Sequence, residues 1–129
     1  MTTDLRYSDK QQILTIKVQG YLTVDSFEAT VLSLLNSDDY YQDVNTMWDI
    51  REMQFDNIDM KFLKQVIKVQ QKYAQRRGTP KIALLSNYFL AAPIIKLYLI
   101  LSKGLKQKYG AFTSVEEAEL WLCKDSSRR

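Results

Sequence analysis

The apolar positions along the chain form short runs separated by longer stretches with helical spacing. The first two runs, Asp4–Ser8 and Ile13–Val18, flank a polar segment that suits a hairpin turn, and the second is rich in β-branched residues. Two later runs, Thr46–Ile50 and Lys81–Leu85, also predict strands. The last of these is apolar almost without a break, which is typical of a strand covered on both faces. A short final strand is expected at Ala111–Thr113.

Apolar residues three or four positions apart predict four helices. The first is expected over Val24–Asn36 and the second over Ile58–Arg76, with an apolar stripe opposite a lysine stripe. The third should span Pro93–Leu105, because proline is tolerated in a first turn, and Gly110 should end that helical segment. The fourth should follow a capping box at Ser114–Glu117.

The resulting order, ββαβαβαβα, predicts an α/β fold with a mixed, mostly parallel sheet of four to five strands and about four helices. If the strands lie in the order third, second, fourth, fifth, right-handed crossovers place the second and third helices on the same face of the sheet. We expect one domain over residues 1–123 and a polar C-terminal tail over residues 124–129.

Four segments of the chain carry a resemblance to a known family. They are the hairpin end Val18–Thr23, the strand end Trp48–Arg51, the buried strand Lys81–Leu85 and the C-terminal stretch Ala111–Leu122. Together they resemble the SpoIIAA-like proteins of the STAS superfamily, the anti-sigma-factor-antagonist fold. The resemblance covers nearly the whole chain, and its C-terminal stretch is the most specific part. It implies a central sheet of four or five strands with helices packed on it.

The resemblance also implies two kinds of function. The family's true antagonists switch protein partners through a phosphorylated serine at a helix start after the third strand. The matching segment here, Phe55–Asp59, contains no serine or threonine, so this switch is expected to be absent. Single-domain relatives have been likened to lipid-carrying Sec14-type domains, which suggests an apolar ligand beneath a movable helix.

The composition excludes several kinds of catalysis. The chain has no histidine, so Ser-His-Asp and Cys-His mechanisms are ruled out, and the commonest metal ligand is missing. Cys123 is the only cysteine, which fits a reducing compartment. The N-terminus lacks the pattern of a secretory signal, and the longest apolar stretch is too short to cross a bilayer. We therefore expect a cytoplasmic protein, peripheral to the inner membrane face if it meets one, that requires no cofactor.

Charge is distributed unevenly along the chain. The segment Met60–Phe112 contains eleven basic residues and no acidic ones, whereas the rest has seven basic and fifteen acidic residues, a net charge of −8. Such an asymmetry attracts anions to one surface, although it also suits an ordinary solvated face. The candidates for contact with an anion or a membrane are Lys61, Lys64, Lys68, Lys96, Lys103 and Lys106.

The third predicted helix has more apolar side chains than one packed face needs. It could lie in a membrane interface, cover an apolar pocket, form a homodimer seam or simply be sandwiched in the core. The candidate ligand-binding residues are Tyr88, Ile94, Leu97, Tyr98 and Leu101.

A second group of polar candidates follows the third and fourth strands, at the edge where open α/β sheets bind ligands. Asp49 and Arg51 follow one strand, and Ser86 and Asn87 follow the next, before a helix N-terminus that could bind an anion. Asp49 could instead simply pair with Arg51.

Three hypotheses about function follow. The leading one is a non-enzymatic binding module for a lipophilic or amphiphilic anionic ligand, or for a membrane surface. The second is a protein–protein regulator that lacks the phosphorylatable serine. The third, least favoured, is a metal-dependent enzyme that uses Asp49, Asp56 and Asp59. Nucleic-acid binding is not expected, because the lysine stripe is interleaved with aliphatic rather than aromatic residues.

Overall fold

A five-stranded sheet forms the centre of the protein. The computed structural model describes residues 2–86 and 92–123. The strands are β1 (Thr2–Ser8), β2 (Ile13–Tyr21), β3 (Asn45–Gln54), β4 (Lys81–Leu85) and β5 (Lys108–Phe112). They lie in the order β1-β2-β3-β4-β5, with β1 antiparallel to β2 and all other pairs parallel. The mixed, mostly parallel sheet is thus confirmed, but the expected order third, second, fourth, fifth is wrong, because β3 lies between β2 and β4.

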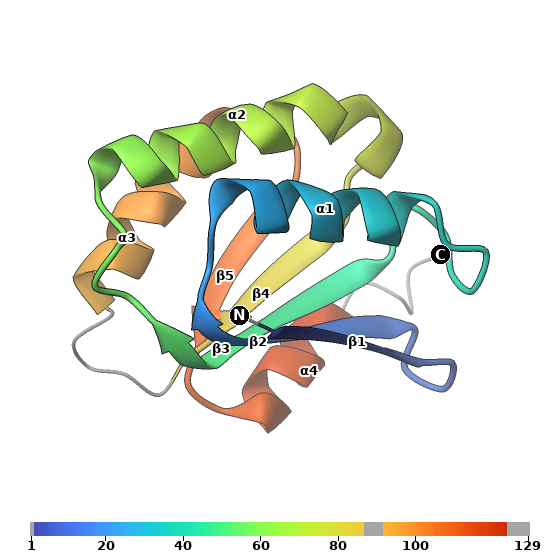
Figure 1. Cartoon of the computed structure of the whole chain (residues 1–129). Helices are drawn as coiled ribbons and strands as arrows, with labels where there is room; N and C mark the ends of the chain where they lie inside the picture. The colour runs from blue at the N-terminus through green and yellow to red at the C-terminus, as the bar shows by residue number, and fades with distance from the viewer. Residues whose placement is uncertain (1, 87–91, 124–129) are drawn as a thin grey trace.

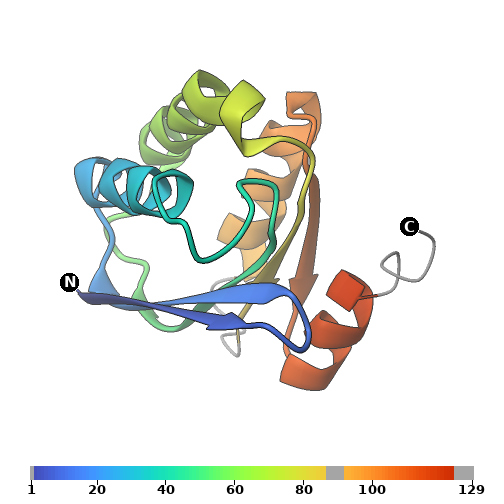
Figure 2. The ribbon, with the colours of Figure 1, turned by 90° about the vertical axis from the view of Figure 1, so that its right-hand side faces the viewer.

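Three helices cover one face of this sheet and a fourth covers part of the other (Figures 1 and 2). The helices are α1 (Val24–Leu35), α2 (Met60–Arg77), α3 (Ala92–Leu101) and α4 (Val115–Cys123), with a short 3₁₀ turn, η2 (Ser102–Gly104), after α3. Each crossover from β2 onward advances by one strand in the same direction, and right-handed crossovers in one direction deliver their helices to one face. The prediction that the second and third helices share a face is confirmed.

Local sequence signals account for most helix boundaries. Thr23 caps α1 by accepting a hydrogen bond from the Ser26 amide, as expected. Gly78 ends α2 with a φ of 79°, a conformation that suits glycine. At the start of α4 the Ser114 hydroxyl accepts from the Glu117 amide, as expected, and donates to the Glu116 carboxylate.

The third strand is longer than its apolar run predicted. β4 pairs with it only as far as Asp49, whereas β2 follows it to the pair Tyr21–Gln54, past a register shift between Lys17 and Gln19. The last residues of β3 are therefore held by β2 alone, and their polar side chains hid this extension from the sequence pattern.

The end of the third helix also differs from the prediction. α3 stops at Leu101, and Gly110 does not break a helix but lies inside β5, paired with Ala83. A Cβ atom at Gly110 would lie 2.9 Å from the Phe112 ring and 3.3 Å from Trp121 of α4. Glycine at this position thus allows α4 to pack closely against the sheet.

The sheet separates two apolar cores. The larger lies between the sheet and α1, α2 and α3, and the smaller lies beneath α4. The smaller core consists of Ile13, Met47, Ala83, Leu85, Ala118 and Leu122. The candidate site is in the larger core.

We predict that Gly110→Ala lowers the free energy of unfolding by about 1–3 kcal/mol, because the added methyl group overpacks the contact with Phe112 and Trp121. Gly104→Ala is the matched control, since no atom lies within 4 Å of its added Cβ. Urea unfolding measures both variants. Equal stabilities for the two would contradict the proposed role of Gly110.

Candidate functional site: an apolar cavity beneath α3

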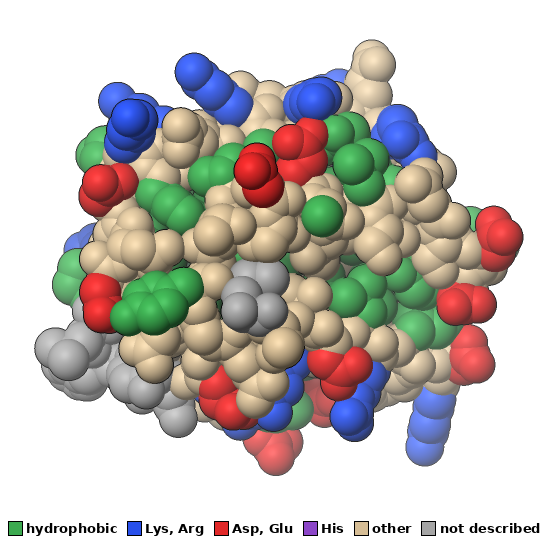
Figure 3. Space-filling model, viewed as in Figure 1, with side chains coloured by type: hydrophobic (Ala, Val, Ile, Leu, Met, Phe, Trp, Pro, Cys, Tyr) green, Lys and Arg blue, Asp and Glu red, His purple; other side chains and the backbone are tan. Residues whose placement is uncertain are grey.

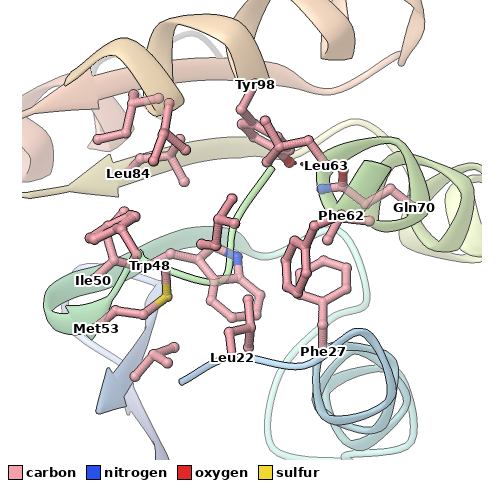
Figure 4. Close-up of a pocket in the computed structure, with 16 residues that line it drawn as sticks. Leu22, Phe27, Trp48, Ile50, Met53, Phe62, Leu63, Gln70, Leu84 and Tyr98 are labelled. Carbon is pink, nitrogen blue, oxygen red and sulfur yellow. Dashed lines mark hydrogen bonds between the residues drawn. The ribbon is translucent and has the colours of Figure 1, made fainter. Parts of the chain in front are cut away.

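A cavity of about 80 Å³ lies between the sheet and the three helices of the upper layer (Figure 4). Its wall combines side chains from β2, β3, β4, α1, α2, α3 and the connections that follow β2 and β3. Except for Gln70, the Tyr98 hydroxyl and the Trp48 indole N–H, the wall is apolar. The lining residues are Val18, Leu22, Phe27, Trp48, Ile50, Met53, Phe55, Ile58, Phe62, Leu63, Val66, Gln70, Leu84, Ile94, Ile95 and Tyr98.

The periodicity of the elements brings these side chains together. Trp48 and Ile50 alternate along β3 and both face the helices, whereas Met47 faces α4. Leu63 and Val66 are three residues apart on α2 and so lie on the same side of that helix. Figure 4 shows Phe62 and Phe27 close together at one side of the cavity and Tyr98 reaching down from α3.

A small neutral hydrogen-bond network forms one end of the cavity. The Tyr98 hydroxyl donates to Gln70 Oε1 over 2.8 Å, and Gln70 Nε2 donates to the Tyr109 hydroxyl over 3.0 Å. Burial raises the pKa of Tyr98 well above its ordinary value and the pKa of Tyr109 to about 12. Both hydroxyls therefore stay protonated near neutral pH, and the network adds no charge to the cavity wall.

Four apolar lining side chains are only partly buried and form the rim. Three belong to the β3–α2 connection and the first turn of α2, namely Phe55, Ile58 and Phe62, and the fourth is Ile94 of α3. Asp59 fixes the start of α2 by accepting from the Phe62 amide over 2.8 Å. The rim is thus an apolar opening beside the N-terminus of α2.

Only some of the predicted ligand-binding residues line this cavity. Ile94 and Tyr98 line the cavity, together with Ile95. Leu97 and Leu101 pack against the larger core outside the lining, and Tyr88 lies outside the described residues. Most of α3's apolar surface is used in packing, although Ile100 remains 52% exposed. Sequence reasoning missed the contributions of β3 and α2, because their lining residues have the same pattern as ordinary core residues.

The six lysines predicted to meet an anion or a membrane are all exposed. None of them makes an ion pair with a side chain within residues 2–86 and 92–123. Figure 3 shows basic side chains spaced along the upper margin of the molecule, over α2. α2 and α3 are neighbours on one face of the sheet. Lys61, Lys64 and Lys68 belong to α2 and Lys96 to α3, whereas Lys103 lies in η2 and Lys106 just after it.

Three other basic residues of the same segment do not belong to this exposed set. Lys72 pairs with Glu28 of α1 over 3.0 Å. Arg77 and Lys81 are buried, and Lys81 Nζ donates to the Trp121 carbonyl of α4 over 2.8 Å. Fewer basic residues therefore contribute unpaired charge to the surface than the eleven in the segment Met60–Phe112.

Asp49 and Arg51 form a structural ion pair. Arg51 Nε and Nη2 donate to the two carboxylate oxygens of Asp49 over 2.9 and 2.8 Å, and Asp49 is only 6% exposed. Hydrogen bonding to Arg51 lowers the pKa of Asp49, despite its burial. The pair lies on the sheet face that carries α4, so it is separate from the cavity.

The other sheet-edge candidates also have structural roles. Asp56 accepts from the Tyr21 hydroxyl and Asp59 caps α2, so neither lies in a shared carboxylate cluster with Asp49. Within the described residues, no three acidic or cysteine side chains come close enough to hold a metal ion. Ser86 is buried and its amide donates to the Phe112 carbonyl, six positions before the first described residue of α3. Residues 87–91, between Ser86 and α3, lie outside the described residues, so the anion site expected at Ser86 and Asn87 stays a prediction.

Comparisons with known proteins identify the fold. No family model and no curated protein matches this sequence. An uncharacterised DUF3478-family protein with a SpoIIAA-like fold, from Shewanella loihica PV-4, superposes with a TM-score of 0.63 at 17% identity, covering 95% of this chain and 93% of that one. The anti-sigma factor antagonist SpoIIAA in its unphosphorylated form superposes with a TM-score of 0.52 at 11% identity, covering 98% of each chain. The predicted SpoIIAA-like fold is confirmed. None of the described helices has the length and apolar character needed to span a membrane.

We predict that Asp49→Asn lowers the free energy of unfolding by about 1–3 kcal/mol at neutral pH, because it leaves the Arg51 guanidinium without its anionic partner. The folded-state pKa of Asp49 lies below its ordinary value of 3.8. The carboxylate therefore stabilises the fold above that value, and the stabilisation is lost as the pH falls through the folded-state pKa. The difference between wild type and variant should thus shrink below about pH 4, measured by urea unfolding. Asp4→Asn, at an exposed pair with Arg6, is the control and should change stability little.

Proposed function

We propose that this protein is a non-catalytic module that binds an anionic amphiphile. The apolar part of the ligand would occupy the cavity beneath α3, and its anionic group would meet the exposed lysines of α2 and α3. An anionic membrane surface would supply the same ligand chemistry. The single observation that supports this proposal is the nearly all-apolar cavity with a partly exposed apolar rim.

The chemistry of the wall favours an apolar ligand over a polar one. A polar ligand would lose its hydration on entering and would find only Gln70, the Tyr98 hydroxyl and the Trp48 indole N–H as partners. An apolar group would instead gain about 25 cal/mol for each Å² of surface removed from water.

The size of the cavity implies that α3 moves when such a ligand binds. Sites for drug-sized ligands usually enclose about 300–1,000 Å³, whereas this one encloses about 80 Å³. α3 supplies Ile94, Ile95 and Tyr98, and it faces α2 across the cavity (Figure 4). We infer that a longer ligand separates α3 from α2 and leaves the sheet unchanged.

The lysine row favours a ligand with a negatively charged end. Lys61 lies in the first turn of α2, next to the rim residue Phe62, and Lys64 and Lys68 continue along the same helix. None of these three lysines forms an ion pair within the described residues, so their positive potential raises the local concentration of an anionic ligand.

Decanoate should bind saturably and change the fluorescence of Trp48, which lines the cavity. The titration uses a Trp121→Phe background, so that Trp48 is the only tryptophan. Ile94→Phe, which narrows the rim, should weaken binding by roughly tenfold. Ile100→Phe makes the same change on the exposed side of α3 and should leave binding unaltered. A fluorescence and melting temperature that decanoate leaves unchanged would refute the proposal.

Replacing Lys61, Lys64 and Lys68 together by glutamine should weaken decanoate binding severalfold and reduce its dependence on ionic strength, because the variant removes positive potential near the rim. Decanol, which has no charge, should bind the variant and the wild type equally. Lys10→Gln, in the β1–β2 turn, is the control. Equal losses for decanoate and decanol would mean that the lysines do not recognise an anionic group.

A second candidate function is that of a protein–protein regulator. It is favoured by the SpoIIAA-like fold over 98% of the chain, since one similar structure is that of an anti-sigma factor antagonist. The segment Phe55–Asp59 offers no serine or threonine, so any such partner would have to bind without phosphorylation there. A purified partner that forms a stoichiometric complex in analytical ultracentrifugation, and is displaced by no amphiphile, would support this candidate over the first.

A further inference from the structure

A second, smaller cavity lies next to the first in the larger core. Its volume is about 30 Å³, more than the roughly 10–15 Å³ that one water molecule requires. Phe27, Trp48 and Gln70 line both cavities, so these three side chains form the wall between them. We call the smaller one the inner cavity. Its lining also includes Val31, Leu34, Tyr73, Arg77, Ile82, Gln107 and Tyr109.

Gln107 presents an unpartnered acceptor in this wall. Its Nε2 donates to the Gly78 carbonyl over 3.0 Å, which fixes the orientation of the amide. Its Oε1 is buried and accepts no hydrogen bond from any described residue, and the whole residue is only 7% exposed. Because a buried acceptor without a donor costs about 1–3 kcal/mol, the site calls for a donor from outside the chain.

Arg77 brings a buried cation to the same cavity. It is 7% exposed, and its guanidinium donates to the carbonyls of Gln42 and Val44 and to the Thr46 hydroxyl. No carboxylate within the described ranges forms an ion pair with it. Burial lowers the pKa of Arg77 to about 10, so the group stays charged near neutral pH.

We propose that the inner cavity is a binding site for a single O–H group, which donates to Gln107 Oε1 and lies in the field of the Arg77 guanidinium with its oxygen toward the cation. An anion is disfavoured, because it cannot donate to Gln107, and an ammonium is disfavoured by Arg77. A hydroxyl satisfies both groups, because it can donate and accept.

Either of two molecules can supply this O–H group. One is an internal water molecule, and the other is a hydroxyl at the buried end of the ligand in the larger cavity. The second source rests on the proposed function, since it requires an amphiphile that enters past the rim. Such a ligand would have its anionic group at the lysines and its hydroxyl beyond Gln70.

The water source is tested by NMR on the unliganded protein. The Gln107 side-chain amide should show a negative nuclear Overhauser effect to water, the sign of a long-lived internal water. The Gln71 amide, on the exposed face of α2, is the control and should lack that sign. A negative effect at Gln107 supports the proposal whether or not any amphiphile binds, so it survives a failure of the proposed function.

The ligand source is tested by comparing decanoate with decanoate hydroxylated at its terminal carbon. If the ligand supplies the O–H group, the hydroxylated acid should bind wild type about threefold to tenfold more tightly and abolish the water signal at Gln107. Gln107→Met should remove this preference, and Gln71→Met should preserve it. Absence of both the water signal and a Gln107-dependent preference would overturn the proposal, even if decanoate itself binds.

Discussion

The handedness of the β–α–β crossovers is the constraint on which the rest of the structure depends. From β2 onward each crossover moves one strand in the same direction, so α1, α2 and α3 all lie on one face. Three helices then share a single apolar layer, and their side chains meet over the middle of the sheet around Trp48. Both cavities lie in this layer, between the helices and the sheet.

Buried cations tie the layers together in this molecule. Arg77, at the last position of α2, reaches the chain that leads into β3, and Lys81, at the first position of β4, reaches the C-terminal end of α4. Carbonyl oxygens at the C-terminal end of a helix lack donors within the helix. Lys81 donates a hydrogen bond to one of these carbonyls in α4. These two residues explain why a segment that contains eleven basic residues and no acidic ones does not present all of that charge to solvent.

Much of the fold could be predicted from local pattern, whereas little of the site could. Thr23, Gly78 and the unbroken run of β4 define boundaries through chemistry that acts within a few residues. The strand order and the position of Gly110 depend instead on partners far along the chain, and no periodicity encodes them. The cavity wall has the pattern of core residues, because a hollow arises from how the helices are spaced and not from residue type. Nothing in the sequence distinguishes Gln107 from other glutamines, because only folding leaves its buried Oε1 without a hydrogen-bond donor.

The smaller core depends on α4, and this affects how the chain folds during synthesis. Ala118 and Leu122 of α4 are buried in a cluster whose other buried members come from β2, β3 and β4. Synthesis proceeds from the N-terminus, so α1, α2, α3 and the sheet are made while one apolar face still lacks its cover. During that interval the exposed face of the sheet is an aggregation-prone surface, so the formation of α4 limits the yield of folded protein.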